Sequence, residues 1–206
     1  ARRTAGAVLG GGRAAARLAL VAADATALPL ADGSADRVLM LDVVEHLHPW
    51  QLAAALAEVR RIVRSDGYVI IHTLPNRWAL AIAYPWLRLA RPDLPAQPRS
   101  DYERAVHVNE QDPWRLHRAL GSAGLASRVW VEDWTTRHAA RAGGRRYPDP
   151  ARDRGYAVAG RPLARRLMRL GMATPLRWAL ANDIFALAWP AGASGPGRGA
   201  KLGRVR

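Results

Sequence analysis

Two continuous apolar runs joined by an amphipathic helix constrain the fold of this chain more than any other feature. The first run ends in Val-Leu-Met-Leu at residue 41, and the second is Tyr-Val-Ile-Ile-His-Thr over residues 68–73. Between them, Leu52, Leu56 and Val59 recur on one face of a helix. Continuous apolar strands are typical of sheets covered on both faces, and strands that alternate with helices through short links indicate a parallel sheet. We therefore expect an α/β fold.

The rest of the chain extends this pattern. Further strands are expected at residues 18–22, 127–132 and 183–189, and further helices at 78–90, 112–123 and 162–180. The turn formers at 65–67 are expected to end the first helix. Residues 137–161 are rich in Gly, Pro and Arg and lack periodicity, which predicts an insertion. Residues 191–206 are predicted to form a basic disordered tail, so that one partial domain spans residues 1–190.

The formal net charge of +14 raises the question of a nucleic-acid partner. The distribution of the charge argues against one, because arginines are scattered along the chain and concentrate only at 137–154 and 198–206. Lys201 is the only lysine, and Phe185 is the only phenylalanine, so an aromatic platform for stacking RNA bases is not expected. We interpret most of this charge as a solvated surface.

The absence of cysteine excludes disulfides and thiolate metal sites and is typical of cytoplasmic proteins, so we predict that location. No run of eighteen uncharged apolar residues is present, and no membrane-spanning helix is expected. Peripheral contact with a membrane surface stays open. The sequence does not indicate an oligomeric state.

Two acidic residues each follow a short apolar segment. Asp24 comes after the strand expected at 18–22, and Asp42 comes directly after the run that ends at residue 41. Carboxyl ends of parallel strands meet at one edge of an open α/β sheet, and ligands bind at that edge. The sequence therefore predicts that both carboxylates serve a binding site, although an Asp in such a position also caps turns.

Four segments of the sequence resemble motifs of a known protein family. Residues 24–32 read Asp-Ala-Thr-Ala-Leu-Pro-Leu-Ala-Asp, and residues 36–47 contain Leu-Asp-Val-Val-Glu-His-Leu. Residues 70–76 read Ile-Ile-His-Thr-Leu-Pro-Asn, and His-Val-Asn at 107–109 precedes a helix. In order and spacing they resemble class I S-adenosylmethionine-dependent methyltransferases of the subgroup that methylates small molecules. The resemblance implies a Rossmann-like sheet, mostly parallel with an antiparallel last strand.

The resemblance also implies roles for individual residues. Asp24 would accept a hydrogen bond from the adenine amino group of the cofactor, S-adenosylmethionine, and the amide of Ala25 would donate to a ring nitrogen. Asp42, Val43 and His46 would line the same cofactor pocket. The acceptor implied is a small, apolar molecule, for which residues 78–87 form either a lid or ordinary core packing.

No catalytic residue is assigned from the sequence. His46 could act as a general base, because an imidazole titrates near neutral pH, or could cap the following helix. His107 either faces the acceptor or packs. A metal site is not expected, since His46 and His48 lie two residues apart on a turn with no third ligand nearby in the sequence.

The N-terminal part departs from the family pattern. Gly10, Gly11 and Gly12 form a glycine run, but only eleven residues separate Gly12 from Asp24, whereas a βαβ unit needs roughly 30 residues. We therefore predict that the first strands, with the glycine-rich loop and the acidic ribose ligand, are missing, and that the chain alone binds S-adenosylmethionine poorly. Two alternatives remain: a basic module that binds nucleic acid or an anionic surface through 137–154 and the tail, and a degenerate fragment with a structural role.

Overall fold

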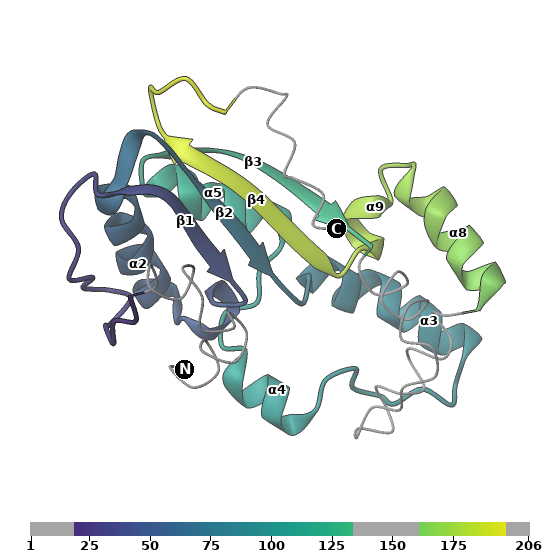
Figure 1. Ribbon diagram of the computed structural model, residues 1–206. Helices are drawn as coiled ribbons and strands as arrows, with labels where there is room; N and C mark the ends of the chain where they lie inside the picture. Colours follow the sequence, from purple (N-terminus) through teal and green to yellow (C-terminus); the bar gives the residue numbers. More distant parts are fainter. Residues whose placement is uncertain (1–18, 134–160, 197–206) are drawn as a thin grey trace, which may run out of the picture.

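A four-stranded sheet organises the residues that the computed structural model describes, which are 19–133 and 161–196 (Figure 1). The strands lie in the order β1-β2-β4-β3. Strands β1 and β2 are parallel, whereas β4 lies between β2 and β3 and is antiparallel to both. The bounds are β1 Ala35–Leu41, β2 Val63–Thr73, β3 Leu125–Glu132 and β4 Asp183–Pro190.

This sheet confirms the predicted Rossmann-like α/β class and its antiparallel last strand. The parallel share in the described residues is smaller than expected, because β4 inserts between two strands and makes both of its pairings antiparallel. The insertion predicted at 137–161 and the tail predicted at 191–206 fall largely on residues 137–160 and 197–206, which lie outside the described residues.

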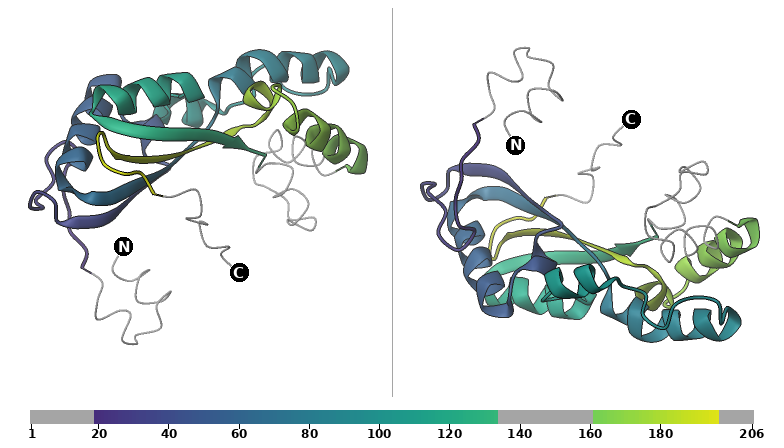
Figure 2. Two further views of the ribbon diagram at one scale, coloured as in Figure 1. Left: turned by 90° about the horizontal axis from the view of Figure 1, so that it is seen from above. Right: turned by 90° about the horizontal axis from the view of Figure 1, so that it is seen from below.

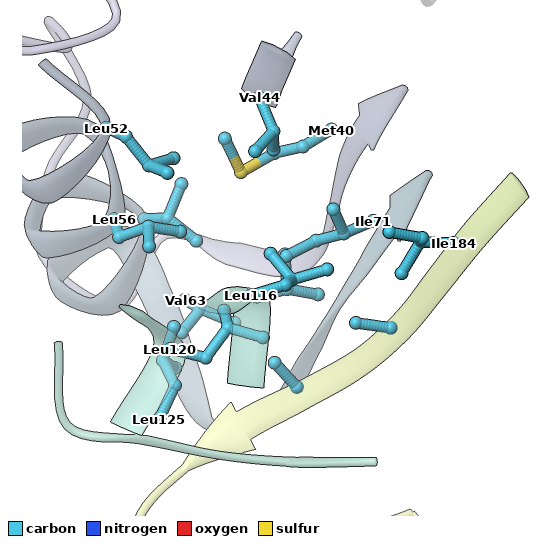
Figure 3. Packing of buried hydrophobic residues seen from close by; sticks show 14 of the residues in the cluster. Met40, Val44, Leu52, Leu56, Val63, Ile71, Leu116, Leu120, Leu125 and Ile184 are labelled. Carbon is cyan, nitrogen blue, oxygen red and sulfur yellow. The ribbon is translucent and has the colours of Figure 1, made fainter. Parts of the chain in front are cut away.

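The hydrophobic core lies between one face of the sheet and two helices, α2 (Pro49–Ile62) and α5 (Pro113–Ser122) (Figure 2). Leu56 of α2 and Leu116 of α5 are fully buried against Ile71 of β2 (Figure 3). Helix α2 forms where the sequence repeats apolar residues at helical spacing, and Pro49 occupies its first turn, where a missing N–H costs nothing.

The second face of the sheet is more open than predicted. Leu39 and Leu41 of β1 are 62% and 51% exposed, whereas Met40 between them is buried in the core. Among the described residues, β1 therefore has one covered face, and the expectation that both faces are covered is not met there.

Smaller elements complete the described part of the chain. These are η2 Val44–His46, η3 Ala79–Ala83, α3 Tyr84–Ala90, α4 Asp101–Val106, α8 Pro162–Met172 and α9 Arg177–Leu180. None of the described helices combines the length and apolarity needed to cross a bilayer. Helix α4 was not predicted, although Ser100 and Glu103 form a reciprocal capping box that its sequence encodes.

Two predicted boundaries are wrong. Residues 19–22 of the strand predicted at 18–22 have no regular structure and are exposed, because no described strand lies beside them to pair with their backbone. The turn formers at 65–67 lie inside β2 rather than before it. Ala35 pairs with Val63 and Arg37 with Tyr68, so the intervening residues of β2 form a bulge that absorbs the turn.

Asn76, just after β2, anchors the carboxyl end of the sheet to the chain that precedes β4. Its side chain is fully buried and its Nδ2 donates to the carbonyls of Trp178 and Ala181, both at 2.8 Å. Its backbone N–H donates to the carbonyl of Asn182 at 2.8 Å. A single amide thus satisfies two buried carbonyls where three segments meet.

We expect Asn76→Ala to lower the free energy of unfolding by about 2–4 kcal/mol, because two buried carbonyls lose their donor. Chemical denaturation followed by circular dichroism measures this. The control is Gln97→Ala at an exposed position, which should change stability little. Equal effects of the two substitutions would contradict the anchoring role.

Candidate functional site

Polar groups converge where β1 and β2 end at the same edge of the sheet. Leu41 pairs with His72, so the residues that follow each strand emerge side by side. Asp42 follows β1 with a φ of 55°, a left-handed conformation that Asp adopts more readily than most residues. Its N–H donates to the carbonyl of His72 at 3.1 Å, and η2 begins two residues later.

The side chain of His72 bridges two carboxylates. Its Nδ1 lies 2.6 Å from Oδ1 of Asp42, and its Nε2 lies 3.1 Å from Oδ1 of Asp183 at the start of β4. The ring of Phe185 packs 4.6 Å from the imidazole, measured between centroids. Since a carboxylate only accepts hydrogen bonds, both bonds are made together when the ring is an imidazolium.

Opposing effects act on the pKa of His72. Burial of the ring lowers it, but the hydrogen bond to Asp183 and the negative charges of Asp42 and Asp183 outweigh burial. The pKa of His72 therefore lies above its ordinary value. The bridge joins β1, β2 and β4 at the edge where a ligand would bind, and it fixes the orientation of Asp42.

A second cluster lies beside the first and contains Glu45, His46 and His107. Glu45 is 1% exposed and accepts a hydrogen bond from Oγ1 of Thr73 at 2.7 Å. The rings of His46 and His107 meet edge to face with 4.9 Å between centroids. One ligand atom of each residue of this cluster lies within 4.8 Å of the others. The fold thus joins His107 to η2 from a distant part of the sequence.

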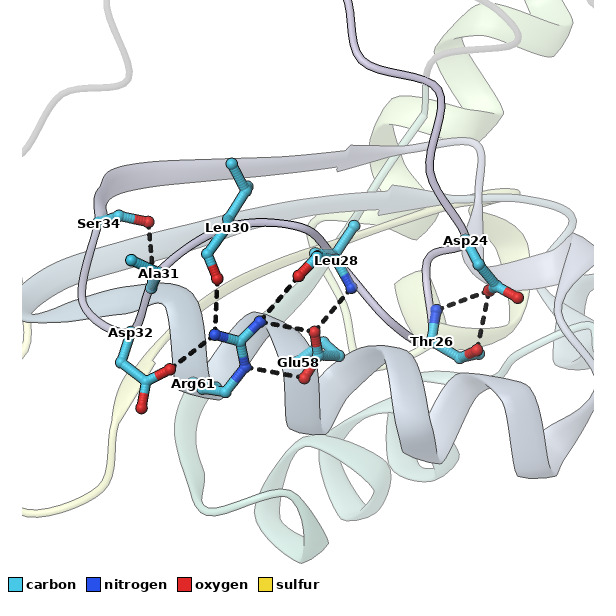
Figure 4. A network of polar contacts seen from close by, with 9 residues as sticks. All are labelled: Asp24, Thr26, Leu28, Leu30, Ala31, Asp32, Ser34, Glu58 and Arg61. Carbon is cyan, nitrogen blue, oxygen red and sulfur yellow. Dashed lines mark hydrogen bonds and ion pairs between the residues drawn. The ribbon is translucent and has the colours of Figure 1, made fainter.

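The segment that contains Asp24 is held along α2 by Arg61 (Figure 4). The guanidinium of Arg61 donates to the carbonyls of Leu28 and Leu30 and pairs with Asp32 and Glu58. Glu58 in turn accepts from the N–H of Leu28 at 2.8 Å.

Asp24 itself forms a turn. Its Oδ1 accepts from both the N–H and the Oγ1 of Thr26, each at 2.8 Å, and these hydrogen bonds lower the pKa of Asp24. Gly33 and Leu30 contact Arg61, whereas Leu28, which is nearer to Asp24 in the sequence, also contacts Glu58, which lies toward the helix N-terminus. Because that end of α2 follows the carboxyl edge of the sheet, the segment carries Asp24 in that direction.

The sequence-predicted site residues thus fall into two groups. Asp42, Val43 and His46 lie together after β1, while Asp24 and the half-buried Ala25 lie in the turn beside α2. The binding roles assigned to them stay predictions.

Sequence reasoning missed the part played by His72 and Asp183. The position of His72 inside an apolar strand could have drawn attention to it. Its partner Asp183, on β4, is too distant in the sequence for a local pattern to reveal the contact.

Two hollows in the described residues lie away from this edge. One, of about 260 Å³, lies between α2 and α5 and is lined by Leu52 and Arg115 among others. The other, of about 350 Å³, lies beside α3 and is lined by Tyr84 and Arg88 among others. Neither of these two hollows is lined by Asp42 or His72.

Comparisons with known proteins bear on the family and the fold. A family model described as a methyltransferase domain matches residues 5–71, which include β1, η2 and α2. A search of curated proteins finds no match.

Among solved structures, the chain is similar to geranyl diphosphate C-methyltransferase from Streptomyces coelicolor A3(2), in complex with Mg²⁺, geranyl diphosphate and S-adenosyl-L-homocysteine. The TM-score is 0.52 at 12% identity, over 91% of this chain and 55% of that one. The chain is also similar to the [4+2]-cyclase SpnF, with a TM-score of 0.50 at 14% identity over 92% of this chain and 61% of that one. At such identities the likeness concerns the fold, and the chain spans 55% and 61% of the two proteins' lengths.

We expect His72→Gln to remove a contribution to stability that depends on pH. Because the folded-state pKa is raised, that contribution is fully present below about pH 6.5, the unfolded value, and is lost as pH rises through the folded pKa. Thermal unfolding of both proteins across this range measures it, and the difference between them should shrink toward alkaline pH. His117→Gln, which alters an exposed histidine bonded to Ser127, is the control. A difference independent of pH would contradict the bridge.

We expect Glu58→Gln to loosen the segment that carries Asp24. The hydrogen bond from Arg61, and then that from Leu28, lower the pKa of Glu58 to about 2. Its contribution is therefore present above about pH 4.3 and is lost as pH falls through about 2. Hydrogen exchange at neutral pH should show faster exchange of the Leu28 amide in the variant. Asp93→Asn, which alters an ion pair elsewhere, should leave that amide unchanged.

Proposed function

Because the chain belongs to the class I S-adenosylmethionine-dependent methyltransferases, we propose that the protein transfers the methyl group of S-adenosylmethionine to a small molecule. The observation that carries the proposal is the polar edge after β1, which lies inside the segment that matches the family. There Asp42 is held in a left-handed conformation and is bonded to His72 through Oδ1. Its side chain is 57% exposed, which leaves Oδ2 for a ligand. The proposed location is cytoplasmic.

The proposed cofactor site consists of Asp24, Ala25, Asp42, Val43 and His46. Both bonds from Thr26 fall on Oδ1 of Asp24, which leaves Oδ2 to accept from an adenine amino group. The amide of Ala25 would donate to a ring nitrogen. The network around Arg61 supports this arrangement, because it restricts the segment before a ligand arrives and so lowers the entropy lost on binding.

Methyl transfer needs orientation and exclusion of water more than it needs an acid or a base. When bound, S-adenosylmethionine supplies an electrophilic methyl group. The bridge at His72 keeps the ligand edge of β1 and β2 rigid, and His46 is the group that could take a proton from an acceptor that must lose one.

An apolar acceptor is part of the proposal. Residues 78–87 were predicted to form either a lid or core, and in the structure this segment has both buried and exposed apolar residues. Ala79 is buried, whereas Ile82 and Trp86 are 49% and 71% exposed. This helical segment follows β2 and Asn76, so it begins at the same edge as the proposed cofactor site.

We expect Asp24→Ala to weaken binding of S-adenosylhomocysteine roughly tenfold, because the adenine amino group would lose its acceptor. Calorimetric titration is run on this chain and on the whole protein that its gene encodes. Asp36→Ala, at an exposed acidic residue beside Arg64, is the matched control. Unchanged affinity in a folded Asp24 variant would reject the adenine role, and absence of binding to the whole protein would reject the proposed function.

A second candidate function is binding to an anionic surface, and α8 is the observation that favours it. Leu163, Leu167 and Leu170 lie on one face of this helix and are 59–68% exposed. The same helix carries Arg165, Arg166 and Arg169. Helices with exposed apolar and basic residues bind at the interface of anionic membranes.

Sedimentation with vesicles tests this candidate. The protein should bind vesicles that contain phosphatidylglycerol more than vesicles of phosphatidylcholine alone, and added salt should weaken that binding. Leu167→Gln should reduce it, whereas Trp114→Gln, at an exposed apolar residue of α5, should not. Loss of vesicle binding on addition of RNA would favour nucleic acid as the partner instead.

A further inference from the structure

We propose that Glu45, His46 and His107 bind one divalent transition-metal cation. Each offers one ligand atom, and these atoms lie within 4.8 Å of one another. Glu45 and His46 belong to η2, and His107 directly follows α4. The fold thus brings a carboxylate and two imidazoles together at the carboxyl edge of the sheet.

His46 is oriented as a metal-binding histidine would be. Its Nδ1 lies 3.0 Å from the backbone carbonyl of Val106, and a carbonyl can only accept. The proton therefore resides on Nδ1, which leaves a lone pair on Nε2. Metal-ligating histidines commonly donate their other N–H to a carbonyl in this way, which fixes both tautomer and ring orientation.

The carboxylate of Glu45 is buried, and few partners offset the loss of its contacts with water. Its Oε2 accepts one hydrogen bond, from the hydroxyl of Thr73, and within residues 19–133 and 161–196 it forms no ion pair with an arginine. A buried carboxylate that has only a neutral donor is costly to keep ionised. A bound cation would supply the missing positive charge.

His107 provides an independent observation. Its Nδ1 is buried and has no hydrogen-bond partner among the described residues. Buried polar atoms are almost always paired, so an unpaired ring nitrogen on a histidine of this cluster indicates a partner that the described residues do not supply. The N–H of Asn109 donates to the carbonyl of Glu45 at 3.0 Å, which holds this segment against η2.

The donor set indicates the class of cation. One carboxylate oxygen and two imidazole nitrogens suit Zn²⁺, Co²⁺ or Mn²⁺, whereas Mg²⁺ and Ca²⁺ prefer oxygen ligands. Bonds of about 2.1 Å place two donors on one cation at most about 4.2 Å apart. The upper limit of 4.8 Å is close to this span, so any wider pair would come within bonding distance by small side-chain rotations.

Three protein ligands leave coordination positions open, which is typical of catalytic rather than structural metal sites. If the proposed function holds, an oxygen of the methyl acceptor would occupy one of them, and the cation would lower the pKa of an acceptor hydroxyl. This second step rests on the proposed function, whereas cation binding does not.

The test is titration of the chelator-treated protein, without any cofactor, with Co²⁺ followed by visible absorption and with Zn²⁺ and Mn²⁺ followed by calorimetry. We expect one equivalent to bind. His46→Ala and His107→Ala should each weaken that binding at least tenfold, while circular dichroism shows that both variants are folded. His117→Ala, at the exposed histidine bonded to Ser127, should leave it unchanged. Glu45→Gln, which removes the negative charge of the third proposed ligand, is titrated in the same way.

Three outcomes would overturn the proposal. They are absence of binding by the wild-type protein, equal affinity in the three histidine variants, and tighter binding of Mg²⁺ than of the three transition-metal ions. Because no cofactor is present, a failure here is distinguishable from a failure of the methyl-transfer proposal, which the separate titration with S-adenosylhomocysteine decides.

Discussion

The parallel pairing of β1 with β2 determines where the polar groups at the carboxyl ends of these two strands lie. Leu41 pairs with His72, so Asp42 and Thr73 lie at the same edge of the sheet. A register shifted by one residue would move the inward-facing Met40 and Ile71 out of the core, so burial of these side chains also maintains the site. Helix α2, which connects the two strands and packs on one face, enforces this register through Leu52 and Leu56.

The elements that the sequence predicts well are those with local causes. Helix α2 follows from apolar residues at helical spacing, and α5 follows from Asp112, which caps it, and Pro113 in its first turn. The strand predicted at 18–22 fails because a strand requires a neighbour, and periodicity cannot supply one. The turn formers at 65–67 were predicted to separate the helix from the strand, but pairing with β1 continues on both sides of them. They therefore form a bulge within β2.

The candidate site shows the same division. Asp42 and His46 could be predicted because strand ends form the ligand edge of α/β sheets. The contacts of Asp183 with His72 and of His107 with His46 join segments far apart in sequence, and no local pattern specifies them. A pair of histidines two residues apart gave no reason to expect a metal, and only the fold supplies the other candidate ligands.

The two clusters at this edge of the sheet differ in how their charged groups are paired. At His72 one imidazole ring lies between two carboxylates, and the raised pKa of the ring favours the charged form that donates to both. At Glu45 a single buried carboxylate lies beside two imidazoles, one of which keeps a free lone pair because its proton is bonded to a carbonyl. The first cluster is held by hydrogen bonds between its own side chains, and it links β1, β2 and β4. In the second cluster the buried carboxylate accepts one hydrogen bond, from a neutral hydroxyl, and a bound cation would stabilise it.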